Sequence, residues 1–427
     1  MRCGLLFAKL RGGSVEYAVL YPNAASDSRT ISVTIVARSF GTSSSWAGGV
    51  TGSTAELPQV QVQLLPGPPK ARMLPRVAFN DSSLGTVCAM QKMTFLPLIL
   101  LGCQFALGQA SGGEPKVVRP GVKEVQVPFA SLKPFTTFKA GGTADWVLIT
   151  ENAVWVASSK PYAVVRIDPA ANKITARVRL PGEACSGLVF GFGSVWVPIC
   201  GKKRLLVRVD SQTNKISAVL SVGPAGAEGG IAASSDSVWI VSDSRGTLNR
   251  VDPGTNTVVQ RVTIPPGSYN PLFSDDIVWI TGFESNVLTA VDATTGTVLA
   301  SVPVGPRPRF LAAGSGSLWT LNQGDGTVSR VDARRKKVTT TIAAGIPGVG
   351  GDICYGADSI WVTVLDVPLT LIDARADKVV RQWVGAGGDS VRFGHGSVWL
   401  TDYRRGLVWR FPYNEALGAV PNDLSQR

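Results

Sequence analysis

We predict an all-β fold, a seven-bladed β-propeller of four-stranded antiparallel blades, from three features of the sequence. Tryptophan recurs at intervals of 38 to 43 residues in similar phrases such as AVWVA, SVWIV and SVWLT. A second phrase, such as VVRIDP or LNRVDP, follows most of these tryptophans after about ten residues. A period near 40 with several short β-rich runs per repeat is typical of a propeller. The seven repeat tryptophans are Trp155, Trp196, Trp239, Trp279, Trp319, Trp361 and Trp399.

The repeats span about residues 144–411, and each one predicts four short strands. In the third repeat we expect strands at 230–233, 237–242, 247–252 and 257–264, separated by turns rich in Gly, Pro, Asn and Ser. We expect each repeat tryptophan to fill the wedge between neighbouring blades. The aspartates of the second phrase are periodic, so we interpret them as turn caps and not as catalytic acids. They are Asp168, Asp210, Asp252, Asp292, Asp332 and Asp373.

The seventh repeat is incomplete, because no outer strand follows GLVWRFPYN before the chain ends. Strand-like runs occur earlier, within residues 123–139. We therefore expect this N-terminal segment to supply the outer strand of the last blade and to close the ring. Closure would remove the exposed strand edges of an open sheet.

Residues 90–110 have the form of a secretory signal peptide. Lys92 supplies a positive charge, Thr94 to Leu107 is an apolar run, and a small-residue cleavage site ends at Ala110. The stretch from Leu100 to Cys103 also resembles a bacterial lipobox, in which Cys103 would be acylated. Either route predicts an exported protein, periplasmic or secreted, with membrane attachment only if Cys103 is lipidated.

Residues 1–89 precede this signal and show no repeat and no clear strand or helix pattern. We interpret them as an N-terminal extension that comes from a mis-called start or is disordered. The propeller domain is then residues 111–427.

Two cysteines of the second repeat predict a disulfide. Cys185 precedes the innermost strand and Cys200 follows the strand that carries Trp196. Because these strands are antiparallel neighbours, both cysteines fall at the same end of one blade. An exported protein can keep such a bond oxidised.

The formal net charge is +12, but the basic residues are scattered. A nucleic-acid-binding protein would gather them on one face, so we expect no nucleic-acid partner. Three basic runs stand out, Lys202 to Arg204, Arg334 to Lys337 and Arg404-Arg405, and we interpret them as solvated loops.

The phrases VDPGTNTVV and VPVGPRP resemble the YVTN-repeat family of exported propellers. The phrases GSGSLWT and GHGSVWLTD resemble the streptogramin B lyase (virginiamycin B lyase) family. The resemblance covers about residues 125–411 and implies a seven-bladed propeller. Resemblance to the lyases also implies a metal-assisted elimination that opens a cyclic peptide lactone, with glutamates at the ends of the tryptophan strands and a histidine.

This chain departs from the lyase pattern at the residues that carry the chemistry. Three residues after each repeat tryptophan, only Asp402 is acidic. His395, the one histidine, precedes Trp399 by four residues, which predicts a turn on the face opposite the pocket. A general base on the pocket face is therefore missing.

Ligands of propellers usually bind in the funnel where the inner strands enter the ring. The positions nine and ten residues before each tryptophan should line this funnel, and they differ between blades. Asp145, Asp352 and Asp389 could hold a divalent metal ion, whereas Arg309 in the same ring suits an anion. The candidate ligand-binding residues are Asp145, Trp146, Ser186, Tyr269, Asn270, Arg309, Phe310, Asp352, Asp389 and Asp402.

Two classes of function remain. We favour a non-catalytic, monomeric binding propeller that takes an unidentified small molecule or envelope protein in its funnel. The alternative is an enzyme, a metal-dependent lyase or hydrolase acting in the same funnel. No catalytic residue is assigned, and no cofactor is expected beyond the possible divalent metal ion in the channel.

Overall fold

A computed structural model describes residues 119–414 and 417, together with four short strands before residue 64. The chain divides into two compact units, Met1–Gln109 and Ala110–Arg427. In the described part of the chain, no helix is long and apolar enough to cross a membrane.

The first unit contains strands that the sequence analysis did not identify. They are β1 (Leu6–Lys9), β2 (Val15–Pro22), β3 (Thr30–Arg38) and β4 (Gln61–Gln63), and they pair in that order in one antiparallel sheet. The expected signal peptide at 90–110, with Lys92 and Cys103, lies outside the described residues and stays a prediction.

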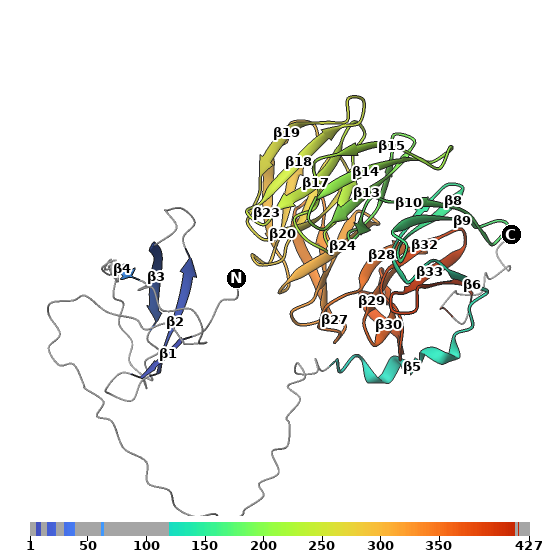
Figure 1. Cartoon of the computed structure of the whole chain (residues 1–427). Coiled ribbons are helices and arrows are strands. Elements are labelled where there is room, and N and C mark those ends of the chain that lie inside the picture. The colour runs from blue at the N-terminus through green and yellow to red at the C-terminus, as the bar shows by residue number, and fades with distance from the viewer. Residues whose placement is uncertain are drawn as a thin grey trace, which may run out of the picture. The chain divides into compact units, whose positions relative to one another are not determined.

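The second unit is a ring of seven antiparallel blades (Figure 1). Blade 1 contains β7 (Thr143–Thr150), β8 (Ala153–Ser159), β9 (Ala163–Asp168) and β10 (Lys173–Arg179). Blade 2 contains β11 (Glu183–Ala184), β12 (Val189–Gly191), β13 (Ser194–Cys200), β14 (Leu205–Asp210) and β15 (Lys215–Leu220). Blade 3 contains β16 (Ile231–Ala233), β17 (Val238–Asp243), β18 (Thr247–Asp252) and β19 (Thr257–Thr263), close to the bounds that the sequence predicts.

The remaining blades repeat this arrangement. Blade 4 contains β20 (Ser268–Ser274), β21 (Ile277–Gly282), β22 (Val287–Asp292) and β23 (Val298–Pro303). Blade 5 contains β24 (Pro308–Gly314), β25 (Ser317–Asn322), β26 (Thr327–Asp332) and β27 (Lys337–Ala343). Blade 6 contains β28 (Asp352–Gly356), β29 (Ser359–Val364), β30 (Val367–Asp373) and β31 (Lys378–Val384). Blade 7 contains β32 (Val391–Gly394), β33 (Ser397–Asp402), β34 (Leu407–Pro412) and β6 (Thr136–Lys139).

The predicted closure is confirmed, because β6 pairs antiparallel with β34 as the outer strand of blade 7. Phe138 of β6 lies opposite Val408 and stacks on Trp399, with ring centroids 5.9 Å apart. The same N-terminal segment adds a strand that the sequence analysis did not predict. After the short 3-10 helix η1 (Lys123–Val125), β5 (Gln126–Pro128) pairs parallel with β31, and η2 (Phe129–Ser131) then leads toward blade 7.

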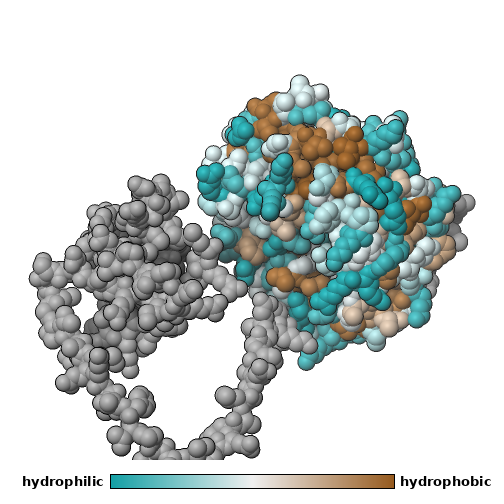
Figure 2. All heavy atoms as spheres, viewed as in Figure 1, coloured by the Kyte–Doolittle hydropathy of each residue, from teal (hydrophilic) through white to brown (hydrophobic). Residues whose placement is uncertain are grey.

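Burial along the strands follows from their place in each blade. All seven repeat tryptophans are fully buried, in apolar clusters of aliphatic side chains. The outer strands instead alternate exposed and buried residues, as a strand with one solvated face does. Val219, Val259, Val298 and Leu299 remain exposed on them. In Figure 2 apolar residues gather over the upper part of the propeller, amid a mostly hydrophilic surface.

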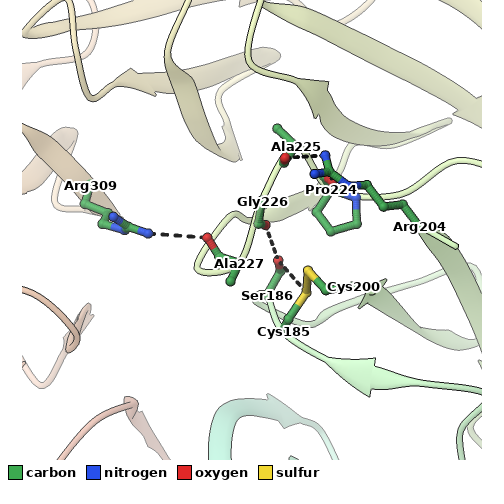
Figure 3. Close-up of a disulfide and its surroundings, with 9 residues drawn as sticks. All are labelled: Cys185, Ser186, Cys200, Arg204, Pro224, Ala225, Gly226, Ala227 and Arg309. Carbon is green, nitrogen blue, oxygen red and sulfur yellow. Dashed lines mark hydrogen bonds between the residues drawn. A yellow bond between two sulfur atoms is a disulfide. The ribbon is translucent and has the colours of Figure 1, made fainter. Parts of the chain in front are cut away.

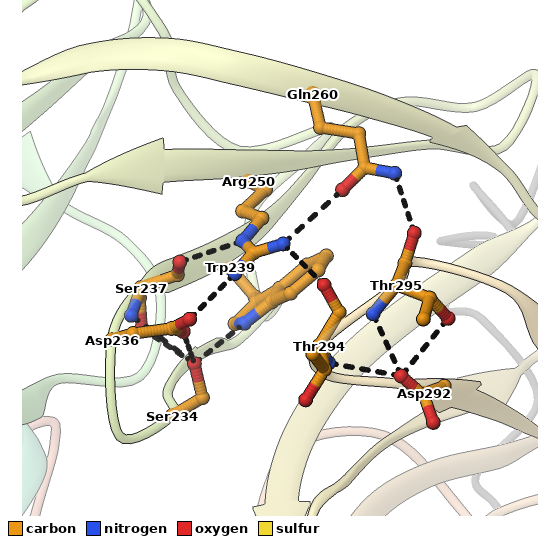
Figure 4. A network of polar contacts seen from close by, with 9 residues as sticks. All are labelled: Ser234, Asp236, Ser237, Trp239, Arg250, Gln260, Asp292, Thr294 and Thr295. Atoms are coloured by element: carbon orange, nitrogen blue, oxygen red, sulfur yellow. Dashed lines mark hydrogen bonds and ion pairs between the residues drawn. The ribbon is translucent and has the colours of Figure 1, made fainter.

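An arginine connects neighbouring blades at several junctions, as Arg250 does between blades 3 and 4 (Figure 4). Its guanidinium carbon lies 5.4 Å from the ring centroid of Trp239, the residue directly opposite it on β17. Its Nε donates to Ser237 Oγ at 2.7 Å, and its Nη1 donates to the carbonyl of Thr294 in the next blade at 2.8 Å. We call this set of contacts the arginine bracket. It ties one tryptophan, its own hairpin and the adjoining blade together.

The arginine bracket recurs at Arg208, Arg330 and Arg410, which contact blades 3, 6 and 1 through Pro253, Ala374 and Pro169, respectively. Each of these arginines also donates from Nε to a serine of its own blade at 2.9 Å. Blades 4 and 6 carry Ala290 and Leu371 at the equivalent position and have no arginine there.

The periodic aspartates cap turns, as predicted. Asp210 Oδ1 accepts the N–H groups of Gln212 and Thr213 at 3.1 and 2.7 Å. Asp168, Asp252, Asp292, Asp332 and Asp373 accept equivalent N–H groups. These bonds hold the pKa of Asp210 below its ordinary value.

Replacing the bracket arginine should destabilise the ring. Arg250→Met keeps the apolar stem but leaves Asp236, Ser237 Oγ and the Thr294 carbonyl without its donors. Losing charge-assisted hydrogen bonds of this kind should lower the free energy of unfolding by about 2 kcal/mol. Denaturant unfolding measures the loss. The matched control is Arg261→Met on β19, which is exposed and should change the free energy by less than about 0.5 kcal/mol. Equal losses of unfolding free energy in the two variants would contradict a stabilising role for the arginine bracket.

Candidate functional site

The candidate site lies where the loops between blades meet at one end of the ring, which we call the funnel face. Each loop runs from the outer strand of one blade to the inner strand of the next. Asp145, Tyr269, Arg309 and Asp389 all lie at these loop–strand junctions or in the first residues of an inner strand, as the repeat register predicts. The seven-fold scaffold therefore brings residues that are far apart in sequence to one end of the channel.

Two aromatic side chains meet across the channel. Trp146 of blade 1 and Phe310 of blade 5 are each 3% exposed, and their ring centroids are 5.7 Å apart. They form part of the lining of a cavity of about 230 Å³, together with Asn270, Asp352 and Arg392. The contact therefore places two rings from non-adjacent blades side by side in the lining of this cavity.

Two carboxyl groups of the funnel, one from blade 1 and one from the loop that leads into blade 7, have raised pKa values. Asp145 and Asp389 are 8% and 7% exposed, and the Asp145 side chain hydrogen-bonds that of Asp389. Burial, followed by the charges of Asp389 and Glu228, raises the pKa of Asp145 well above its ordinary value. Burial raises the pKa of Asp389 to about 6, although bonds from Gly351 N–H and from Asp145 oppose that rise. A hydrogen bond between two carboxyl groups needs a proton, and the raised pKa values keep that proton on the pair to higher pH than on an isolated aspartate.

Glu228 faces Arg309 at the same end of the ring. Burial and the charge of Asp389 raise the pKa of Glu228 to about 7, and Arg309 partly offsets this rise. The Arg309 guanidinium lies 4.4 Å from the ring centroid of Tyr269 and 5.2 Å from that of Phe283. Its Nη2 donates to the carbonyl of Ala227 at 3.3 Å. Arg309 is thus held by aromatic rings and by the loop that carries Glu228.

The other two candidate aspartates already have basic partners. Asp352 is 2% exposed and forms an ion pair with Arg392, while it also accepts from Ser390 Oγ at 2.7 Å. Asp402 forms an ion pair with Arg405 at 2.5 Å. Within the described residues, no group of three or more His, Cys, Asp or Glu side chains is arranged to hold a metal ion. Asp145, Asp352 and Asp389 lie near enough for their charges to interact, but they do not form a metal-binding group.

The disulfide positions the loop that carries Glu228 (Figure 3). Cys185 and Cys200 are bonded, with Cα atoms 5.7 Å apart. The carbonyl of Cys185 accepts the N–H of Glu228 at 2.7 Å, and Ser186 Oγ donates to the carbonyl of Gly226 at 3.4 Å. Ser186 is fully buried. Its observed role is therefore to hold this loop.

Asn270 holds two of the funnel loops in place through hydrogen bonds of its side-chain amide. Its Nδ2 donates to the carbonyl of Arg309 at 2.7 Å and to that of Glu228 at 3.1 Å. The side-chain amide of Asn270 thus connects the loop that carries Glu228 with the loop that carries Arg309. Both of its N–H groups are used by the protein.

His395 lies at the opposite end of blade 7, in the two-residue turn between β32 and β33. Its φ of 50° and that of Gly396, 64°, suit a tight hairpin turn. Its Nε2 lies 2.9 Å from the carbonyl oxygen of Thr150. The structure therefore places this histidine away from the funnel carboxyls.

Glu228 and Arg392 are the charged site residues that the sequence analysis missed. Glu228 stands eleven residues before Trp239, one position outside the stretch compared between blades. Arg392 stands seven residues before Trp399, where the other blades carry Leu, Val, Ala or Cys. Extending the register comparison to these positions would have identified both.

The fold and the funnel together define a seven-bladed β-propeller with an acidic funnel. No protein-family model matches the chain, and no curated protein matches it. Among solved structures it is similar to "The crystal structure of BamB from Moraxella catarrhalis", at a TM-score of 0.47 and 12% sequence identity. The alignment covers 64% of this chain and 85% of that chain. This identity is too low to transfer a function.

Stability should fall as the pH rises from about 4 to about 7. Because the pKa values of Asp389 and Glu228 are raised to about 6 and about 7, the folded protein keeps protons that the unfolded chain has lost in this range. Asp389→Asn should reduce this pH dependence of the free energy of unfolding by on the order of 3 kcal/mol, since the pKa rises by about two units and each unit corresponds to about 1.4 kcal/mol. Urea unfolding across this range measures the effect. Asp325→Asn, at an exposed loop, is the control, and an unchanged slope in Asp389→Asn would contradict the assignment.

Proposed function

We propose that this protein is an exported, non-catalytic binding propeller whose funnel takes a ligand with a cationic group. The ligand is a small molecule or an exposed segment of an envelope protein that carries an ammonium or guanidinium group. The observation that carries this proposal is the Asp145–Asp389 carboxyl pair with Glu228 beside it. A cation near these groups would favour their ionised forms and would be attracted to them.

The distribution of charge supports a cation over an anion. The carboxylates of Asp352 and Asp402 already have arginine partners, whereas the Asp145–Asp389 pair has no ion-pair partner among the described residues. Arg309 is the basic residue of the funnel ring, and it is stacked on aromatic rings next to Glu228. An anionic ligand would have to compete with Glu228 for this guanidinium.

Export is supported by the signal-like sequence at 90–110 and by the Cys185–Cys200 bond. Structural disulfides persist in oxidising compartments and are rare in the cytosol. The two observations are independent, since one rests on residues upstream of the ring and the other on the geometry of blade 2.

One observation favours an enzyme as the second candidate. A carboxyl pair with a shared proton can act as general acid and general base, as such pairs do in several hydrolases. The lyase alternative needs a histidine at the pocket, whereas His395 lies at the opposite end of its blade. Binding remains the proposal, because it requires only the charge and burial of the funnel groups.

Titration calorimetry with arginine amide and spermidine as cationic probes, and citrate as the anionic probe, tests the proposal. Affinity for the cations should rise with pH between about 5 and about 8, because binding requires the ionised carboxylates. Asp389→Asn should weaken it roughly ten- to a hundredfold, which corresponds to the loss of one charge-assisted contact.

Asp325→Asn is the matched control, since it removes an acidic residue from an exposed loop of the same face. Tighter binding of citrate than of either cation would refute the proposal. So would equal cation affinity in Asp389→Asn and the wild type. Turnover of a peptide or glycoside substrate that Asp389→Asn abolishes would instead establish the enzyme.

A further inference from the structure

The loops that join the second and third strands of each blade lie on the funnel face and are segregated by charge. In blades 7, 1, 2 and 3 they carry basic residues, and in blades 4, 5 and 6 they carry acidic ones. Of these basic residues, we call Arg404, Lys160, Lys202, Lys203 and Arg245 the basic arc. Arg204 and Arg405 lie in the same loops and donate to the Ala225 carbonyl and to Asp402, respectively. The acidic residues are Glu284, Asp325 and Asp366. The side chains of the basic arc and of these acidic residues are exposed.

The basic arc is poorly neutralised by the protein itself. Arg245 pairs with Asp243 of its own loop at 3.3 Å. Among the described residues, no ion pair involves Lys160, Lys202, Lys203 or Arg404. Four neighbouring blades therefore present positive charge to solvent from one side of the ring.

Tyrosines accompany this charge. Tyr162 follows Lys160 by two residues and is 44% exposed, and Tyr403 precedes Arg404 and is 38% exposed. Exposed tyrosine beside basic side chains is typical of surfaces that meet a membrane–water interface, where the ring lies at the level of the headgroups.

We propose that the basic arc docks on an anionic phospholipid surface. Lys160, Lys202, Lys203 and Arg404 contact headgroup phosphates, and Tyr162 and Tyr403 lie among the headgroups. The acidic loops of blades 4 to 6 are repelled by the same surface. The ring is therefore tilted, with blades 7, 1, 2 and 3 toward the membrane. Tyr403 lies near the funnel carboxyls, since burial and then the charges of groups that include Asp145 and Asp389 raise its pKa. The proposal does not depend on the funnel ligand.

Vesicle co-sedimentation of the full chain tests the proposal. The wild type should bind vesicles of phosphatidylcholine mixed with phosphatidylglycerol more tightly than vesicles of phosphatidylcholine alone. The apolar stretch from Thr94 to Leu107 can contribute to both, and phosphatidylcholine alone measures that contribution. We call the additional binding to vesicles with phosphatidylglycerol the excess binding. It should decrease when salt is raised from about 0.1 M to about 1 M, since the Debye length falls from about 10 to about 3 Å.

The test variant combines Lys160→Gln, Lys202→Gln, Lys203→Gln and Arg404→Gln. Because each basic residue near an anionic membrane contributes about fivefold in affinity, the excess binding should fall at least about tenfold. The matched control removes the same charge from the opposite face. It combines Arg334→Gln, Arg335→Gln and Lys336→Gln in the turn between β26 and β27 with Lys337→Gln at the first residue of β27.

The control variant should keep its excess binding, and both variants should keep the wild-type unfolding midpoint. Equal losses in the two variants would show attraction by net charge alone and would overturn the proposal. Equal binding of the wild type to both kinds of vesicle would also overturn it, and an acidic protein would then be the partner to seek. Cation binding in the funnel is measured separately, so either proposal can fail alone.

Discussion

The ring depends on the way in which each blade is fastened to the next. A repeat tryptophan fills the wedge between two sheets, and in blades 2, 3, 5 and 7 the arginine opposite it covers the ring and reaches a carbonyl of the adjoining blade. The guanidinium donates to serine and backbone oxygens, and Arg250 and Arg330 also pair with Asp236 and Asp377. A buried apolar contact and a polar contact therefore act at the same junction. A charge-assisted hydrogen bond stabilises more than a neutral one. This explains why a chain with few charged residues places arginine at these positions.

A ring fastened in this way leaves the loops of the funnel face free to differ. The buried strand positions repeat from blade to blade, whereas the loop junctions carry Asp145, Glu228, Arg309 and Asp389. Their surroundings raise the pKa values of three carboxyl groups, while five turn aspartates at the opposite end, such as Asp210, have theirs lowered. Burial and the charges of neighbouring carboxylates account for the first group, and N–H donors account for the second.

Much of the fold could be predicted from the sequence, because each blade corresponds to one sequence repeat. The blade count follows from the spacing of the seven tryptophans, and closure by residues 123–139 follows from the missing outer strand of the last repeat. The strands of the first unit and the parallel pairing of β5 with β31 were missed, since neither belongs to a repeat. The contact between Trp146 and Phe310 was missed for another reason. It joins blades 1 and 5 across the channel, and a comparison of equivalent positions cannot show which of them touch.

The candidate site could be predicted in part. Register placed Asp145, Arg309 and Asp389 at the funnel, but it did not show that the side chains of Asp145 and Asp389 would hydrogen-bond each other. That depends on the distance between two loops and on how much water reaches them. Register also suggested Ser186 and Asn270 as ligand-binding residues, whereas the structure uses both to hold loops in place. Side chains at equivalent positions can point to a ligand or to the scaffold, and sequence spacing does not distinguish the two.

The funnel buries carboxyl groups where their ionised forms are disfavoured, and a cationic ligand would stabilise those ionised forms. A carbon-13 NMR titration of protein labelled at the Asp and Glu side-chain carboxyls tests it most directly. Asp389 should titrate near pH 6 and Glu228 near pH 7, with Asp145 above its ordinary range and the turn residue Asp210 below it. Titration of Asp145, Glu228 and Asp389 at their ordinary values, near pH 4, would contradict the account.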